Sequence, residues 1–339
     1  MSFRVRPAGN DDFQSLYEMA KLTGGGFTNL PADRGALVAK LSRSEDAFSR
    51  EEDSDEGDLF VFVLEDMKTK RIRGTCQIFT RVGMQQPFYS YRISTLTQTS
   101  RELGRTFKAE MLSLCTDFEG CSEVGGLFLH PQERAGGLGL LLARSRYLFI
   151  RLHRERFAAK VIAELRGVID EGGGSPFWDA IARRFFGMSF QEADSFNAAH
   201  GTQFIADLMP KTPIYTAMLP ENARAVIGVP HPSGRAAMKM LEREGFTADG
   251  YVDIFDGGPT MAAPTDRIRA IREAREFVLA ATGDAAGGQR TMLAAGRLKD
   301  FAAGYGQMQP TRNDSATLDA ESAARLGIAV GDSFLAVGR

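Results

Sequence analysis

A glycine-rich turn is the clearest chemical signal in this sequence of 339 residues. Arg134-Ala135-Gly136-Gly137-Leu138-Gly139 follows the apolar segment Val124–Leu129, which predicts a strand, and opens a helix predicted from about Leu138 to Arg156. Glycine lets a ligand approach the backbone closely, and the first N–H groups of a helix lie at the positive end of its dipole. The turn therefore suits a pyrophosphate, and a tight turn without a ligand is the alternative.

His231 is the second candidate for chemistry. Pro230 and Pro232 flank it, and their rings bias the backbone toward an extended, rigid conformation. Imidazole has an ordinary pKa near 6.5, so it can accept or donate a proton close to neutral pH. A histidine that only ties its loop to a backbone carbonyl is the alternative. We expect His153, among arginines on the predicted long helix, to be exposed, and His130 to belong to a structural turn.

Other familiar catalytic motifs do not occur in the sequence. It contains no P-loop, no third glycine three residues beyond Gly139 for a dinucleotide fingerprint, and no serine-hydrolase elbow. It also contains no H-E-x-x-H and no spaced Cys/His cluster, so no metal site is predicted. Cys76, Cys115 and Cys121 form no C-x-x-C pair, which predicts buried thiols in a reducing compartment.

The elements that would position these residues follow from hydrophobic periodicity. Strands are predicted at residues 3–6, 59–64, 72–82, 88–93, 124–129, 161–165, 188–190 and 251–255, and helices at 13–20, after Pro31, and at 138–156, 176–186, 220–226 and 236–244. The consecutive strands between residues 59 and 93 favour an antiparallel meander. The acidic segment 45–58 is interpreted as a solvated loop. The pattern predicts an α+β fold.

Composition bounds the class of partner. Lys and Arg number 41 against 43 Asp and Glu, for a net charge of −2, so no basic field exists to attract nucleic acid or an anionic membrane. The 24 phenylalanines, against one tryptophan, predict a Phe-rich core. No apolar run approaches the roughly 18 residues of a membrane span, and the N-terminus does not resemble a signal peptide. We expect a cytoplasmic protein.

The context of the glycine turn adds a family resemblance. R-x-x-G-x-G between a strand and a helix resembles motif A of the GCN5-related N-acetyltransferase (GNAT) superfamily, and the order of elements is similar to that fold. The resemblance implies a mixed, largely antiparallel sheet flanked by helices, and coenzyme A at Arg134, Gly137, Leu138 and Gly139. It also implies a pantetheine arm beside the backbone of Leu127, Phe128 and Leu129.

Longer blocks resemble one family, arginine N-succinyltransferase, from residue 3 to about 275. They lie at residues 23–31, 164–171 (Glu-Leu-Arg-Gly-Val-Ile-Asp-Glu), 175–178, 208–211, 226–232 and 251–259. The resemblance implies transfer of succinyl from succinyl-CoA, as co-substrate, to the α-amine of L-arginine in arginine catabolism, with no bound cofactor. Leu127 matches the family residue credited with succinyl-CoA binding, and His231 matches its proton donor. A partner subunit of a heteromeric arginine/ornithine succinyltransferase, catalytic or not, and a general acyltransferase for another amine are the alternatives.

An arginine substrate requires carboxylates, because paired acceptors satisfy the parallel donors of a guanidinium group. Glu164, Asp170, Glu171, Asp253 and Asp256 are candidates from this need alone. The succinyl carboxylate similarly requires Arg or Lys, and the sequence singles out none of them.

The chain length suggests about two domains. We expect a GNAT-like acyl-CoA-binding domain at residues 1–200, a helix and strand unit with His231 at 201–259, and a small C-terminal β-rich module at 260–339. A helix, glycine and strand order recurs at 180–188 and 237–246, which a second partial GNAT-like unit or coincidence explains. By analogy with the fold we expect a homo-oligomer, with a hetero-oligomer containing a paralogous chain as the alternative.

Overall fold

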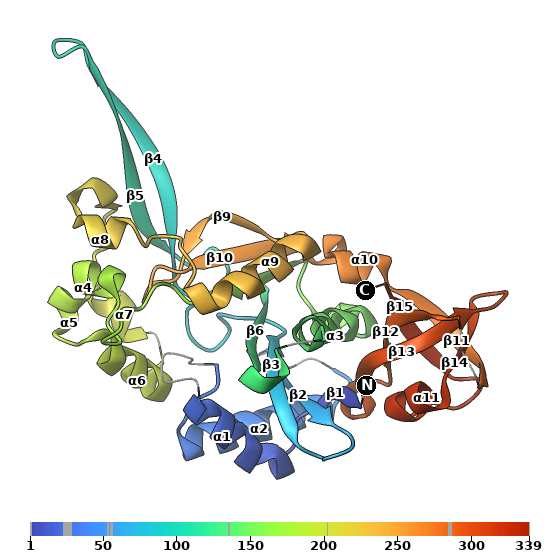
Figure 1. Cartoon of the computed structure of the whole chain (residues 1–339). Helices are drawn as coiled ribbons and strands as arrows, with labels where there is room; N and C mark the ends of the chain where they lie inside the picture. The colour runs from blue at the N-terminus through green and yellow to red at the C-terminus, as the bar shows by residue number, and fades with distance from the viewer. Residues whose placement is uncertain are drawn as a thin grey trace.

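The computed structural model describes residues 2–22, 29–52, 54, 57–134, 136–201, 203–283 and 287–338. The chain forms a long central sheet with helices on both faces and a compact group of C-terminal strands at one end (Figure 1). The strands are β1 (Phe3–Pro7), β2 (Leu59–Asp66), β3 (Ile72–Phe79), β4 (Ser90–Ser100), β5 (Arg105–Cys115), β6 (Ser122–Leu129), β7 (Lys160–Glu164), β8 (Ile214–Tyr215), β9 (Thr247–Val252), β10 (Pro259–Pro264), β11 (Arg275–Thr282), β12 (Gln289–Ala295), β13 (Ala302–Pro310), β14 (Ser315–Leu318) and β15 (Ser333–Val337).

Most of the helices are short, and only two of those described reach fifteen residues. They are α1 (Phe13–Leu22), α2 (Arg34–Phe48), α3 (Leu138–Leu152), α4 (Pro176–Ile181), α5 (Arg183–Phe186), α6 (Phe190–His200), α7 (Gln203–Leu208), α8 (Glu221–Arg224), α9 (Arg235–Glu244), α10 (Arg269–Glu273) and α11 (Ala320–Leu326). None of the helices in the described residues is long and apolar enough to cross a membrane.

The central sheet has the order β1-β2-β3-β6-β7-β10-β9-β4-β5-β8. Its pairs are antiparallel except β6 and β7, which are parallel and connected through α3. The predicted α+β class, with a mixed, largely antiparallel sheet flanked by helices, is confirmed. The strand, glycine turn and helix therefore occupy the middle of the sheet, next to its parallel pair.

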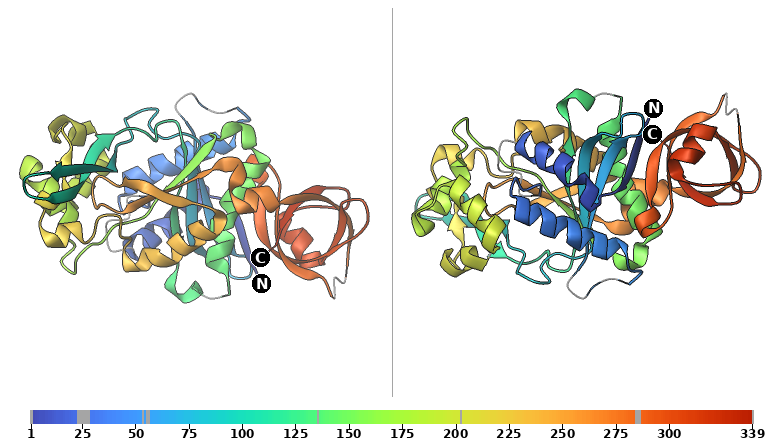
Figure 2. Two further views of the ribbon diagram at one scale, coloured as in Figure 1. Left: turned by 90° about the horizontal axis from the view of Figure 1, so that it is seen from above. Right: turned by 90° about the horizontal axis from the view of Figure 1, so that it is seen from below.

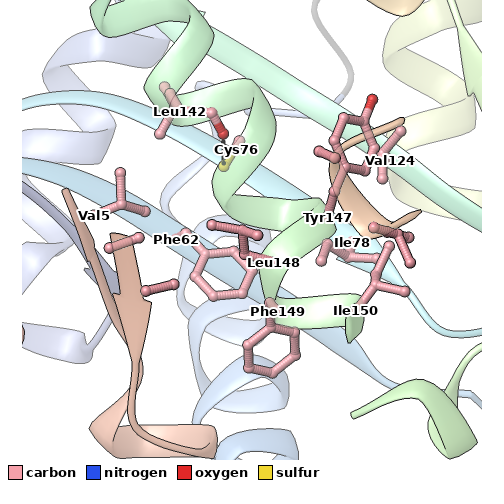
Figure 3. Packing of buried hydrophobic residues seen from close by; sticks show 14 of the residues in the cluster. Val5, Phe62, Cys76, Ile78, Val124, Leu142, Tyr147, Leu148, Phe149 and Ile150 are labelled. Atoms are coloured by element: carbon pink, nitrogen blue, oxygen red, sulfur yellow. Dashed lines mark hydrogen bonds between the residues drawn. The ribbon is translucent and has the colours of Figure 1, made fainter. Parts of the chain in front are cut away.

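One face of the sheet packs on α3, and the predicted phenylalanine-rich core lies there. Figure 3 shows Phe62 of β2 and Phe149 of α3 in contact, with ring centroids 5.1 Å apart, and the Cys76 thiol donating to the Leu142 carbonyl at 3.3 Å. Burial raises the pKa of Cys76 to about 11, so this thiol stays protonated. The apolar residues of α1 and α2 pack on the opposite face, against Val61 and Val63.

The C-terminal strands close on themselves. The pairs run from β12 through β15, β11, β14 and β13 back to β12, which makes a five-stranded barrel (Figure 2). A single register pair, Val5 with Ala303, joins it to β1. Strand β10 pairs with β7 and β9 of the central sheet, so the strands beyond residue 274 are those that form the barrel. The proposed boundary at residue 260 therefore falls inside the central sheet.

The predicted meander is wrong at its third strand. β4 pairs with β5 and β9, and β6 takes the place beside β3. β4 and β5 form a hairpin that projects from the body of the molecule (Figure 1). The strands β5 and β10 were not predicted, and β9 begins four residues before the strand predicted at 251–255.

Three other local predictions are wrong. Residues 188–190 are not a strand, because Ser189 caps α6 in a reciprocal pair with Glu192, a capping box that the S-x-x-E spacing could have revealed. The acidic segment is not all solvated loop, because α2 extends to Phe48 and Asp58 is buried against Arg156 at 2.5 Å. His153 is fully buried, since its Nε2 accepts a hydrogen bond from the Leu298 backbone at 3.2 Å.

Candidate active site

The glycine turn has the geometry of an anion-binding helix start. Gly136 and Gly137 take left-handed conformations, with φ of 68° and 85°, and Gly137 is the residue that precedes the first turn of α3. A Cβ at either position would be strained. Gly139 has room instead: a Cβ there would lie 3.8 Å from Leu129. Arg134 is exposed beside the turn, and Ala135 lies outside the described residues.

The side chain of Leu138 is buried in the core, so only the backbone of Leu138 is available to a ligand at this turn. The barrel contacts the same turn from the other side. The Tyr305 hydroxyl donates to the Gly137 carbonyl at 3.2 Å, and the Arg290 guanidinium lies 3.4 Å from the Gly136 carbonyl and 4.6 Å from the Tyr305 ring. The sequence analysis assigned nothing to these C-terminal residues.

β6 changes its pairing where the resemblance places the pantetheine arm. Only Ser122 and Glu123 of β6 pair with β7, although both strands continue beyond the paired residues. Gly126 lies at a bulge against β3 and has a φ of 58°. The parallel pair therefore opens beside residues 125–129.

The three predicted residues of β6 alternate between the faces of the sheet. Leu127 and Leu129 pack with the core on the α3 side, and Phe128 packs with α1 and α2. The side chains of all three residues pack against the protein. Leu127 could therefore contact an acyl group through its backbone and through the exposed part of its half-buried side chain.

His231 is held next to the end of β7. Its backbone N–H donates to the Arg166 carbonyl at 2.8 Å, and Gly167 forms a β-bridge with Pro230. The ring Nδ1 lies 2.7 Å from Ser233 Oγ and accepts from the Ser233 backbone, which leaves Nε2 for a substrate. Burial, then the positive charge of Arg166, lowers the pKa of His231 from its ordinary value. The ring is therefore neutral near pH 7.

The five predicted carboxylates fall into three sets, of which Glu164 alone is the third. Asp170 is exposed and accepts the Gly174 N–H, and Glu171 is exposed, so neither joins the site. Asp253 and Asp256 shape the turn between β9 and β10, where Asp256 accepts the Gly167 and Gly258 N–H groups at 2.8 Å.

Glu164 differs from the other four. Its Oε1 is shielded from solvent and has no hydrogen-bond partner among the described residues. Burial, followed by the charges of Asp253, Glu123 and Asp256, raises the pKa of Glu164 well above its ordinary value. A carboxylate in this state costs stability, which is typical of a group that a ligand completes.

The sheet register places a second unpartnered atom beside Glu164. Thr260 is the register partner of Glu164 across β10 and β7, so the two side chains share one face of the sheet. The buried Thr260 Oγ1 also has no partner among the described residues. Glu123 pairs with Ile162, two residues before Glu164, and lies on that same face.

A polar network that the sequence analysis missed covers this face. The Lys40 ammonium of α2 donates to Gln77 Oε1 and to the Asn29 carbonyl, and Gln77 donates to Asn29 Oδ1 at 2.6 Å. Burial lowers the pKa of Lys40 to about 7 and raises that of Glu123, with their mutual attraction opposing both shifts. The only available signal was Glu123 within an apolar strand.

The remaining family blocks lie partly outside this site. In the first block, residues 23–28 are outside the described residues, and Asn29 joins the network on α2. His130 begins a turn, where its ring accepts the Gln132 N–H and contacts Arg73, in line with the structural role expected for it. Within the described ranges, no group of three or more His, Cys, Asp or Glu side chains is arranged to hold a metal ion.

Comparisons with known proteins agree over nearly the whole chain. A family model described as arginine N-succinyltransferase beta subunit matches residues 3–270, and a model of its C-terminal domain matches residues 275–338. Proteins named arginine N-succinyltransferase from Salmonella paratyphi B and Salmonella newport are each 46% identical over 271 residues, which is 80% of this chain and 78% of theirs.

A solved structure gives the same relationship in three dimensions. The arginine/ornithine succinyltransferase subunit AI from Pseudomonas aeruginosa superposes with a TM-score of 0.89 and 33% identity, over 99% of this chain and 98% of that one. Its match includes the barrel, which the resemblance seen in the sequence did not reach. The chain belongs to the arginine N-succinyltransferase beta subunit family.

Proposed function

We propose that the chain transfers succinyl from succinyl-CoA to the α-amine of L-arginine. The observation that carries the proposal is the unpartnered Glu164 carboxyl group at the end of β7, where the parallel strands β6 and β7 separate, two residues before the Arg166 carbonyl that accepts the His231 N–H. A cationic amino acid supplies the positive charge that this buried carboxylate lacks. The family membership supports the reaction class, and the glycine turn supports an acyl-CoA donor.

The cofactor binds along β6 and the start of α3. Its pyrophosphate accepts hydrogen bonds from the backbone N–H groups around Gly137 and Gly139, where the helix dipole favours negative charge. Its pantetheine arm follows residues 127–129. A backbone N–H of β6 then donates to the thioester oxygen, and one such donor stabilises the oxyanion by about 3 kcal/mol.

Glu164 binds the guanidinium group of arginine, with Thr260 as its neighbour on the same face. His231 moves the proton of the reaction at its Nε2. The neutral ring accepts the proton that the α-amine loses as the C–N bond forms, and it donates that proton to the sulfur of coenzyme A as the C–S bond breaks. The lowered pKa of His231 keeps the ring in the accepting form at neutral pH.

The direct test is turnover by the purified full chain. A thiol reagent reports coenzyme A release when succinyl-CoA and arginine are both present, and mass spectrometry identifies the acylated product. Thiol release that requires arginine supports the proposal. A folded sample that binds both substrates and releases no thiol contradicts it and leaves a partner subunit as the alternative. Equal turnover of acetyl-CoA would indicate a general acyltransferase.

We also propose that the chain functions as a homo-oligomer in the cytoplasm. The β4–β5 hairpin projects from the body with Leu103 78% exposed and Phe107 43% exposed, and a two-stranded ribbon is marginal in water unless it is covered. The free thiols are compatible with a reducing compartment. Light scattering of the full chain and of Leu103→Lys tests self-association, because a charge at the hairpin tip opposes its burial.

A further inference from the structure

Arg166 lies in the middle of the candidate site, although no role has been given to its side chain so far. The adjacent Leu165 packs in the core on the α3 side, so the side chains of Glu164 and Arg166 lie on the opposite face of the extended chain. Glu123 and Thr260 share that face. The Arg166 carbonyl also binds the His231 backbone at 2.8 Å.

The Arg166 guanidinium has no anionic partner within the described residues. Its Nε is shielded from solvent and makes no hydrogen bond there, and none of the ion pairs in the structure includes it. The nearby carboxylates are used elsewhere, since Asp256 accepts backbone N–H groups and Glu164 has its own unpartnered oxygen. A half-buried arginine in this state is costly unless a ligand supplies an anion.

We propose that Arg166 binds a substrate carboxylate in the active site. A guanidinium group presents paired donors that match the two oxygens of a carboxylate, which a lysine does not match as well. The proposal rests on the proposed function, in which both substrates carry such a group. Succinyl-CoA has a distal carboxylate and arginine has an α-carboxylate. Either source fits the same chemistry, and the experiment separates them.

The arrangement of charges explains why one arginine at this position matters. Glu164 and Arg166 are two residues apart on one extended segment, so a carboxyl group and a guanidinium group face the same side of the sheet. A substrate with a cation at one end and a carboxylate at the other satisfies both unpartnered groups together. A neutral amine or an unsubstituted acyl chain leaves at least one of them desolvated and unpaired, which is how polar sites reject such analogues.

The test compares Arg166→Gln and Arg166→Lys with the wild type and with Arg235→Gln, an exposed arginine four residues after His231. Donors are succinyl-CoA and butyryl-CoA, which has the same chain length without the carboxylate. Acceptors are arginine and agmatine, which lacks the α-carboxylate. Calorimetry measures binding of each ligand, so the test does not depend on turnover, and thermal melting confirms that each variant is folded.

A selective loss supports the proposal. If Arg166 binds the succinyl group, Arg166→Gln lowers kcat/KM or affinity for succinyl-CoA roughly 10- to 100-fold, as expected for one charge-assisted hydrogen bond, and leaves butyryl-CoA unchanged. If it binds arginine, the loss appears with arginine and not with agmatine. Arg166→Lys restores part of the loss because it keeps the charge, and Arg235→Gln changes nothing.

Two results would overturn the proposal. One is unchanged binding of both carboxylate ligands, and the other is an equal loss for all four ligands, which indicates a structural role. A wild-type chain that binds succinyl-CoA and arginine without transferring the acyl group contradicts the proposed function instead. In that case the binding measurements still decide the role of Arg166.

Discussion

Replacing Glu164 by glutamine is the sharpest test of how the site recognises its cationic substrate. The substitution keeps the shape of the side chain, its place opposite Thr260 and its acceptor oxygen, and it removes only the ability of the group to ionise. Oε1 is already without a partner among the described residues, so no hydrogen bond within them is lost at that atom. Any loss of arginine binding therefore reports on the ligand.

The size of the effect follows from the charge of the pair. A hydrogen bond to a charged group contributes about 1.5–3 kcal/mol, and each 1.4 kcal/mol corresponds to a factor of ten. Glu164→Gln should therefore raise the dissociation constant of arginine about 10- to 150-fold. The affinity for coenzyme A should not change, because the glycine turn opens α3, which packs on the opposite face of the sheet from Glu164.

Stability should change in the opposite direction. The folded pKa of Glu164 is raised above its unfolded value, so the folded chain holds this proton where the unfolded chain loses it. The wild type therefore loses stability as pH rises above about 4.3, the ordinary value for glutamate, toward the raised folded pKa. The glutamine variant avoids this loss, and its melting temperature should exceed that of the wild type by more at pH 8 than at pH 5.

Calorimetry with arginine and thermal melting at the two pH values provide the measurements. Glu171→Gln is the matched control, because Glu171 is exposed in the segment after β7 and should affect neither quantity. A glutamine variant that melts lower than the wild type and binds arginine equally well would show that Glu164 is a structural residue. The assignment of the guanidinium site would then be wrong.

The remaining predictions concern the proton, the cofactor and the barrel. His231→Ala should lower kcat by ~10²- to 10⁴-fold with little change in melting temperature, and a kcat within a few-fold of the wild type would exclude proton transfer by this ring. Because the pKa of His231 is lowered in the free protein, the acidic limb of the wild-type kcat/KM profile should lie below the ordinary histidine value. Gly139→Glu should weaken binding of coenzyme A much more than Gly139→Gln does, because a Cβ has room beside Leu129 and only glutamate repels phosphate. Equal affinities of the two variants would contradict the assignment of the pyrophosphate to this turn. Tyr305→Phe should raise the KM for succinyl-CoA several-fold and leave the KM for arginine unchanged. The reverse pattern would show that the barrel does not contribute to coenzyme A binding.

Local signals in the sequence predicted the secondary structure around the glycine turn. The strand before the turn, the two left-handed glycines and the long helix are consecutive in the chain, so periodicity and composition suffice to place them. The α+β class followed from the same patterns. The full length of the projecting hairpin was not predicted because β4 is mostly exposed. The alternation of apolar and polar residues that indicates a strand therefore ends near Ile93.

The substrate side could not be predicted in the same way, because pairing between distant segments creates it. The requirement for a guanidinium partner selected five carboxylates. Only the structure shows that Glu164 lies opposite Thr260 and that its Oε1 has no partner among the described residues. The sequence spacing of Lys40 and Glu123 carries no information about the electrostatic attraction between them. Arg166 lies in the family block at residues 164–171, where the sequence gives it no distinguishing feature. Its burial and its missing partners are visible only in the structure.

The barrel is attached to α3 at both ends and in the middle of the helix. Tyr305 contacts the carbonyl before the first turn of the helix, the Arg144 side chain donates to the Gly338 carbonyl at 2.8 Å, and His153 at the end accepts from Leu298. His153 and Arg144 are both buried, so these contacts are shielded from water and hold the helix firmly. Because the first N–H groups of α3 are the proposed pyrophosphate ligands, the barrel fixes their direction through the helix axis. The C-terminal strands, which showed no functional signal in the sequence, therefore support the helix that carries the proposed coenzyme A site.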